Sequence, residues 1–170
     1  GYSDLGCYGG EIRTPTIDSL AKTGLRYTQC YNTAKCFPSR ACLLTGVYAQ
    51  QCNMSRRHGK IKNAVTLGEV LKTAGYRTIH CGKGHLGAHG TAGADPANLG
   101  FDVNIAGHAA GGPGSYYGTH NFSAAWRGGD RIWDVPGLDK YHGQDINLTE
   151  ALTREATAEI ERAVSDNVPF

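Results

Sequence analysis

The chain has 170 residues, of which 40% are hydrophobic and 19% are charged, a balance typical of globular proteins and not of disordered ones. Its formal net charge of +2 is too small to indicate nucleic acid or a membrane surface as a partner. An anionic ligand would therefore have to be held by local cations. No apolar run approaches the length of a membrane span.

The N-terminal part of the chain predicts a helix, a strand and a second helix. Residues 14–24 read as a helix with Pro15 in its first turn, and Gly24 ends it. The side chains of residues 25–31 alternate in a pattern that predicts a strand, with Leu25, Tyr27 and Gln29 on one face. After a loop, residues 36–46 predict the second helix.

A further helix is predicted over residues 66–74, because Thr66 and Glu69 have the spacing of a capping box. Residues 76–81 then read as a strand. The resulting strand–helix–helix–strand order predicts an α/β fold with a mostly parallel or mixed sheet flanked by helices. Four apolar residues give the predicted helix a stripe: Leu67, Val70, Leu71 and Ala74.

The last third of the chain combines irregular structure with one long helix. Residues 107–118 are glycine-rich and predict a loop. A final helix is predicted over residues 147–165. The segment between them reads as irregular, anchored by three aromatic side chains: Trp126, Trp133 and Tyr141.

Six cysteines are spread over the first half of the chain: Cys7, Cys30, Cys36, Cys42, Cys52 and Cys81. Their even number would permit a disulfide framework. The irregular spacing, without a C-x-x-C pair, argues against a zinc site. If Cys36 is modified, at least one of the other five stays unpaired, and the count leaves the redox compartment open.

The most informative segment is residues 36–46, which read CFPSRACLLTG. Cys36 lies at the mouth of a predicted helix, and Ser39 and Arg40 offer a hydroxyl and a planar cation there. A helix N-terminus is a natural anion site and can activate a nearby thiol. Cys36 is therefore a candidate reactive residue, the alternative being a small buried hydrophobe.

A second cluster follows the strand predicted over residues 76–81. Residues 82–87 read GKGHLG, and in extended backbone Lys83 and His85 would project to the same side. Ligands of open α/β sheets bind at the carboxyl ends of strands, where this pair would lie. The alternative is a basic turn with a solvated lysine and a histidine satisfied by its neighbours.

Both segments resemble signatures of the type I sulfatases, within the alkaline phosphatase-like superfamily. The Cys-x-Pro-Ser-Arg run with its Leu-Leu-Thr-Gly tail is similar to the segment whose cysteine that family converts to formylglycine. Residues 82–87 are similar to the family's Gly-Lys-Trp-His-Leu-Gly segment, with Gly84 in place of the tryptophan. The resemblance extends to residues 1–9, 14–21 and 99–102.

The resemblance implies hydrolysis of an aryl or carbohydrate sulfate ester. The formylglycine hydrate derived from Cys36 would attack sulfur with calcium assistance. Arg40 and Lys83 would hold the modified residue and neutralise charge, and His85 would assist proton transfer. Lys83 and His85 are also the expected substrate-binding residues. Ser39 would serve either recognition by the maturation enzyme or capping of the helix.

The resemblance also sets expectations for the whole protein. Residues 1–170 would be the N-terminal portion of a single sulfatase catalytic domain, truncated at both ends and incomplete as a fold, with the calcium ligands mostly outside this chain. The implied partners are a sulfate ester and, during maturation, a formylglycine-generating enzyme; neither nucleic acid nor a membrane is expected. The family resemblance implies a periplasmic, secreted or lysosomal location.

Two other functions stay open at this point. A hydrolase of the same fold acting on phosphate or phosphonate esters would need a similar anion pocket. The isolated chain could also be a non-catalytic fragment. Four histidines are each either part of a substrate cleft or surface residues: His58, His108, His120 and His142.

Overall fold

The computed structural model describes residues 2–56 and 59–170, and the chain divides into two compact units, Gly1–Asn32 and Thr33–Phe170. No helix of the described residues is long and apolar enough to cross a membrane. All six cysteines are free thiols, so the even cysteine count does not correspond to disulfide pairs.

The first unit is built around helix α1, Pro15–Thr23, which confirms the helix predicted there. Its first turn is tied down by Asp18, whose carboxylate accepts from the Cys7 N–H at 2.7 Å and from the Thr14 hydroxyl at 2.9 Å. The strand predicted over residues 25–31 is wrong: this segment is irregular and pairs with no strand among the described residues. An alternating pattern becomes a strand only where a neighbouring edge can accept its hydrogen bonds.

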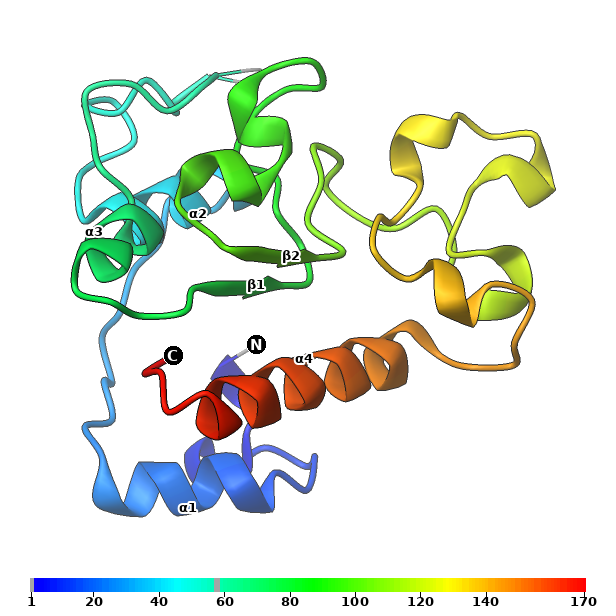
Figure 1. Ribbon diagram of the computed structural model, residues 1–170. Coiled ribbons are helices and arrows are strands. Elements are labelled where there is room, and N and C mark those ends of the chain that lie inside the picture. Colours follow the sequence, from blue (N-terminus) through cyan, green and yellow to red (C-terminus); the bar gives the residue numbers. More distant parts are fainter. Residues whose placement is uncertain (1, 57–58) are drawn as a thin grey trace. The chain divides into compact units, whose positions relative to one another are not determined.

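The second unit holds a small parallel sheet flanked by helices, which confirms the predicted fold class (Figure 1). Strand β1, Ile79–Cys81, pairs with β2, Val103–Ile105, in the register Ile79 to Val103. Helix α4, Leu148–Ser165, packs against both strands. β1 begins three residues later than predicted, and the sequence analysis missed β2, which is as short as β1.

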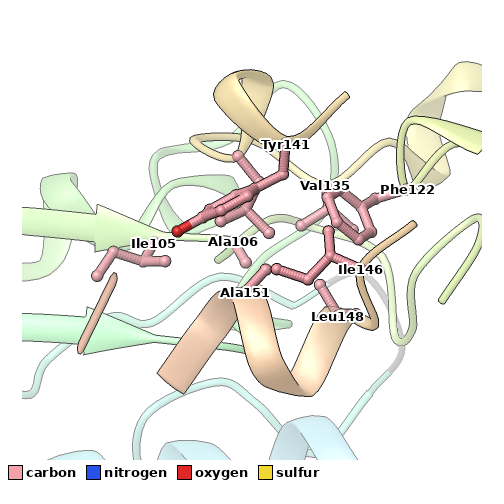
Figure 2. Close-up of a cluster of buried hydrophobic side chains, with 9 residues drawn as sticks. Ile105, Ala106, Phe122, Val135, Tyr141, Ile146, Leu148 and Ala151 are labelled. Carbon is pink, nitrogen blue, oxygen red and sulfur yellow. The ribbon is translucent and has the colours of Figure 1, made fainter. Parts of the chain in front are cut away.

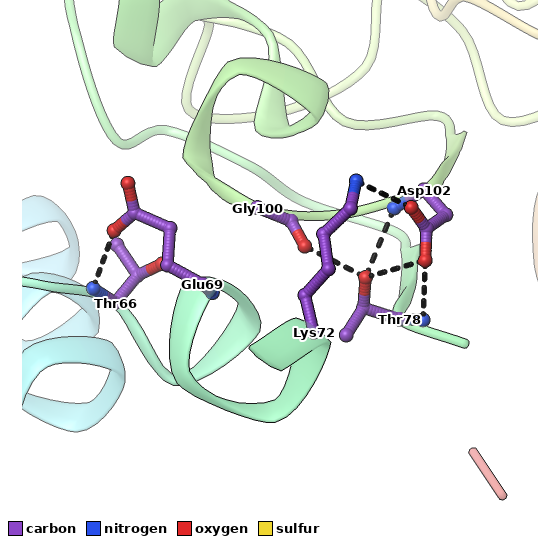
Figure 3. A network of polar contacts seen from close by, with 6 residues as sticks. All are labelled: Thr66, Glu69, Lys72, Thr78, Gly100 and Asp102. Carbon is purple, nitrogen blue, oxygen red and sulfur yellow. Dashed lines mark hydrogen bonds and ion pairs between the residues drawn. The ribbon is translucent and has the colours of Figure 1, made fainter. Parts of the chain in front are cut away.

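Helix α3, Leu67–Thr73, begins with the predicted capping box. The Thr66 hydroxyl accepts from the Glu69 N–H at 3.2 Å, and the Glu69 carboxylate accepts from the Thr66 N–H at 2.7 Å (Figure 3). The same Thr66 hydroxyl donates to the Leu99 carbonyl at 2.6 Å, which joins α3 to the approach to β2. The predicted apolar stripe is not a core face, because Leu67 and Val70 are about half exposed.

A second link between α3 and the sheet runs through Asp102. Its carboxylate accepts from the Thr78 N–H at 3.1 Å and pairs with the Lys72 ammonium at 2.5 Å (Figure 3). The Thr78 hydroxyl also donates to the Gly100 carbonyl at 2.7 Å. The bond from Lys72, followed by those from Thr78, lowers the pKa of the Asp102 carboxyl, so the link is formed at neutral pH.

The main core lies between β2, the irregular segment 119–146 and the start of α4 (Figure 2). Tyr141 is 7% exposed and donates its hydroxyl to Glu155 at 2.6 Å, which confirms it as an anchor. The same prediction is wrong for Trp126 and Trp133, which are 55% and 40% exposed. Phe122 and Leu138, both fully buried, hold this segment instead.

Candidate active site

Cys36 is the first residue of helix α2, Cys36–Thr45, and its side chain is exposed. Lys35 precedes it in extended conformation, and the first helical bond joins the Ser39 N–H to the Lys35 carbonyl at 3.2 Å. Pro38 falls in the first turn, where a missing N–H costs no helical bond, and its ring is buried. The helix therefore presents Cys36 at its electropositive end.

α2 is seated on a small apolar cluster that fixes the direction of its N-terminus. Ala41 on the helix and Met54 in the following loop are buried there, with Phe37 and Cys42 packed against them. Ser39 ties down the approaching chain, because its hydroxyl lies 2.7 Å from the Thr33 hydroxyl and accepts from the Thr33 N–H at 3.2 Å. In this structure Ser39 orders the loop that leads to Cys36.

Arg40 joins α2 to the segment that follows β1. Its Nε donates to the Gly84 carbonyl at 2.7 Å, and its Nη2 donates to the Lys83 carbonyl. Burial lowers the pKa of the Arg40 guanidinium, while the nearby Cys36 sulfur acts in the opposite direction. The two sequence motifs, more than 40 residues apart, are thus brought together by the backbone of one and a side chain of the other.

Residues 82–87 are an irregular segment and not the continuous extended segment assumed from sequence. Gly82 and His85 both have positive φ, +92° and +54°, so the alternation that would place Lys83 and His85 on one side does not apply. The His85 N–H donates to the His108 carbonyl at 2.8 Å. A Cβ on Gly84 would lie 3.0 Å from the His108 backbone. The backbone at His108 therefore occupies the space that a side chain at position 84 would need.

The His85 imidazole is placed beside the start of α2. Its ring meets Phe37 edge-on, with ring centroids 5.8 Å apart. On another side lies Gly111, where an added Cβ would come within 3.1 Å of the imidazole Cε1. The glycine-rich loop 107–118, predicted as a loop and found as one, therefore supports the imidazole as well as connecting two elements.

A cleft of about 670 Å³ opens in front of Cys36 and His85. Arg40 and Lys83 are not among the residues that line it. Two basic residues that the sequence analysis did not single out do line it, Lys35 and His89. The remaining lining residues are mostly small or apolar: Ala34, Phe37, Met54, Gly59, Gly87, Ala88, Ala109, Ala110, Gly111, Ile132 and Trp133.

For the cleft residues that the sequence did not reveal, the only available signal was closeness in the chain to one of the two motifs. Lys35 and His89 flank the two motifs in the chain, whereas Trp133 is about 100 residues from Cys36 and no local pattern connects them.

The secondary histidine candidates contact other parts of the molecule. His58 lies outside the described residues. The other three make the following contacts: His108 Nδ1 with the Ala106 carbonyl at 3.2 Å, the His120 ring stacked on Trp126 at 4.2 Å, and His142 at 4.0 Å from Asp139. None of these three lines the cleft.

Within residues 2–56 and 59–170, no group of three or more acidic, histidine or cysteine side chains could hold a metal ion. Calcium takes six to eight oxygen ligands, typically including carboxylates. The described residues therefore do not fit a calcium site by themselves.

The chain is similar in sequence to known sulfatases. The chain is 37% identical over 115 residues to an arylsulfatase of Klebsiella aerogenes, covering 60% of this chain and 24% of that protein. Human arylsulfatase A is 43% identical over 110 residues, covering 59% and 22%. The chain thus spans about a quarter of the curated relatives it matches.

Solved structures agree with the fold. The PsFucS1 sulfatase from Pseudoalteromonas sp. superposes with a TM-score of 0.68 at 26% identity, covering 100% of this chain and 40% of that one. BT4656, solved with its substrate D-glucosamine-2-N,6-O-disulfate, superposes with a TM-score of 0.54 at 32% identity, covering 68% and 22%. The model of the sulfatase family matches residues 1–167. The chain belongs to the sulfatase family.

Proposed function

We propose that the protein hydrolyses sulfate esters with a formylglycine derived from Cys36. The observation that carries this proposal is the position of Cys36: exposed, first in α2, and lining the same cleft as His85 in a chain of the sulfatase family. Arylsulfatase A and steryl-sulfatase are among its relatives, and BT4656 was solved with a sulfated sugar. These names support a sulfated small molecule or carbohydrate as substrate.

Residue 36, the start of α2 and His85 have separate roles in the proposed reaction. When present, formylglycine supplies a hydrated aldehyde whose oxygen serves as the nucleophile toward sulfur. The free N–H groups and dipole at the start of α2 favour the negative charge of a sulfate held beside residue 36. His85 lines the cleft next to Cys36 and would carry the proton that leaves the nucleophile.

Arg40 and Lys83 have different roles in this proposal. Arg40 fixes the Lys83–Gly84 backbone to α2, so it sets the position of His85, one residue further on, relative to residue 36. Its buried cation also offsets negative charge at the start of the helix. For Lys83 we keep the role implied by the family resemblance: its ammonium would neutralise charge on the substrate.

The wider expectations belong to the same proposal. Residues 1–170 would form the N-terminal portion of one catalytic domain, and calcium would be held mainly by residues outside them. A formylglycine-generating enzyme would be the maturation partner, and the protein would work in a periplasmic, secreted or lysosomal compartment. Because the chain spans only 21–24% of the curated relatives cited, we expect residues 1–170 alone to be inactive.

The test is turnover of matched esters by the complete protein, made with a formylglycine-generating enzyme. We expect hydrolysis of 4-methylumbelliferyl sulfate, and a Cys36→Ala variant should lose about a thousand-fold or more in kcat/KM. Cys30→Ala is the control, because that exposed thiol lies in the first unit. Faster hydrolysis of 4-methylumbelliferyl phosphate than of the sulfate would instead favour a phosphate or phosphonate ester hydrolase.

A further inference from the structure

Part of the cleft wall is apolar surface that the proposed chemistry does not use. Ile132 and Trp133 line the cleft from the 3-10 turn Arg131–Trp133, and both side chains are exposed, 45% and 40%. Large aromatic side chains are highly buried on average, so a half-exposed tryptophan in a concave site is an informative observation.

The backbone that carries Trp133 is held firmly. Its carbonyl accepts from the Gly114 N–H at 2.7 Å, and the turn is capped by Asp130, whose carboxylate accepts from the Ile132 N–H at 2.9 Å. The next residue, Asp134, accepts from the Ser123 hydroxyl and pairs with Arg131. Trp133 therefore lines the cleft from a turn whose backbone is held by hydrogen bonds.

Apolar and cationic groups are combined in this cleft. Phe37 and Ile132 add aromatic and aliphatic surface to that of Trp133, while Lys35 and His89 add basic groups to the same cleft as Cys36. A ligand that satisfies both kinds of surface has an anionic end and a flat, apolar body. Aromatic pairs gain from stacking beyond the burial of area, which favours a planar ring against the indole.

We propose that Trp133 is a specificity-determining residue that holds the planar, apolar alcohol half of the substrate, so that an aryl sulfate is preferred over a carbohydrate sulfate. This inference rests on the proposed function, since it places the sulfate at residue 36. Trp133 does not act on the reacting atoms. Its contact with the alcohol half is the same in ground and transition states, so losing it changes KM and leaves kcat nearly unchanged.

The experiment compares two tryptophan variants of the complete protein made with a formylglycine-generating enzyme. Trp133→Ala should raise KM for 4-methylumbelliferyl sulfate about ten-fold with little change in kcat, and Trp133→Phe should restore most of the loss. Trp126→Ala is the matched control, because Trp126 is exposed on the neighbouring turn Ala125–Arg127, stacks on His120 and does not line the cleft. For N-acetylglucosamine 6-sulfate, Trp133→Ala should leave KM within about two-fold, a change too small to indicate a lost stacking contact.

Equal KM values for the Trp133→Ala and Trp126→Ala variants on the aryl sulfate would overturn the proposal. A kcat/KM that is higher for the sugar sulfate than for the aryl sulfate, in the formylglycine-containing protein without substitutions, would also overturn it. Calorimetric titration with 4-methylumbelliferone, the aryl alcohol alone, separates this failure from failure of the proposed function. If no sulfate ester is hydrolysed, a selective loss of 4-methylumbelliferone binding in Trp133→Ala still supports the apolar subsite. Undiminished binding in that variant rules it out.

Discussion

Arg40 connects the two motifs through hydrogen bonds from its side chain. Arg40 is in the first turns of α2, and its guanidinium donates to two consecutive carbonyls, those of Lys83 and Gly84. A planar fork makes such a pair of bonds with a single side-chain conformation, whereas a lysine ammonium has no equivalent geometry. Arg40 therefore has a structural role in addition to its cationic one.

An Arg40→Lys substitution tests this role. We expect it to lower the free energy of unfolding by about 1–3 kcal/mol, because at least one buried carbonyl loses its charged donor. Arg154→Lys is the control: its pair with Glu150 on α4 is exposed, and a change within about 0.5 kcal/mol is expected. Urea unfolding measures both, and equal small losses would contradict the structural role of Arg40.

His80, on β1, is the second residue with a consequence that can be measured. It is 7% exposed and packs edge-on against Phe101. Burial lowers the pKa of the His80 imidazole, the Arg40 cation lowers it further, and Asn104 and Asp95 oppose the shift. The folded protein therefore holds His80 neutral at a pH where the unfolded chain would protonate it.

The sign of the pH dependence follows. The unfolded state binds more protons once the pH falls below the ordinary histidine value of about 6.5, so stability should be full above it and fall below it, by up to about 1.4 kcal/mol per pH unit for one group. His80→Gln should flatten this slope between pH 7 and pH 5, and the exposed His89→Gln should not. Parallel slopes for the parent protein and His80→Gln in urea unfolding would refute the assignment.

At the scale of elements, the glycine-rich loop 107–118 is the connection on which the cleft depends. Gly114 lies so close to the next segment that a Cβ there would stand 2.2 Å from the Ala124 backbone nitrogen, and its own N–H holds Trp133. Gly112, two residues earlier, has open space around its Cα. Glycine is thus required at one position for close packing and is dispensable at the other.

This difference gives a paired prediction. Gly114→Ala should destabilise the protein by about 1–3 kcal/mol, because backbone has to move to admit the methyl group. Gly112→Ala should be neutral or slightly stabilising, since it restricts only the unfolded chain. Thermal unfolding of the two variants checks this. A melting temperature for Gly114→Ala as high as that for Gly112→Ala would show that the close contact is absent in solution.

The elements also show which sequence signals carried structural information. Helices were predicted well because their signals are local: Pro15, the Thr66–Glu69 capping box and Asn147, whose side chain accepts from the Thr149 N–H at 2.9 Å. Strands were predicted poorly because pairing is not local. Residues 25–31 alternate without a partner, whereas β2 is only Val103–Ile105 and depends on β1 for its definition.

In the candidate site, too, the features with a local sequence signal could be predicted, and those that depend on the tertiary structure could not. Cys36 and His85 could be found from the sequence because each lies in a motif, and the structure places both in one cleft. The contacts of Arg40 with the Lys83 and Gly84 carbonyls, and the absence of both Arg40 and Lys83 from the cleft lining, could not be predicted, because they depend on the positive φ of His85 and on contacts across more than 40 residues. Trp133 was predicted as an anchor of the irregular segment, and only the tertiary structure shows it lining the cleft.

At the scale of the whole molecule, apolar surface on the helices extends beyond what the described residues cover. Leu67 and Val70 on α3 are about half exposed, and Val164 on α4 is 65% exposed. An amphipathic pattern indicates that a helix face is apolar, but it does not identify what packs on it. The sequence therefore predicted the apolar stripe on α3, and the structure adds that Leu67 and Val70 within it are about half exposed.

The proposed catalytic mechanism depends most on the chemical state of residue 36. Peptide mass spectrometry across Cys36, on protein made in its natural host or together with a formylglycine-generating enzyme, tests it most directly. We expect an aldehyde in place of the thiol at this residue, with Cys42 on the same helix unmodified. An unmodified thiol at Cys36, despite a maturation system that converts a known substrate in the same cells, would contradict the proposed sulfatase mechanism.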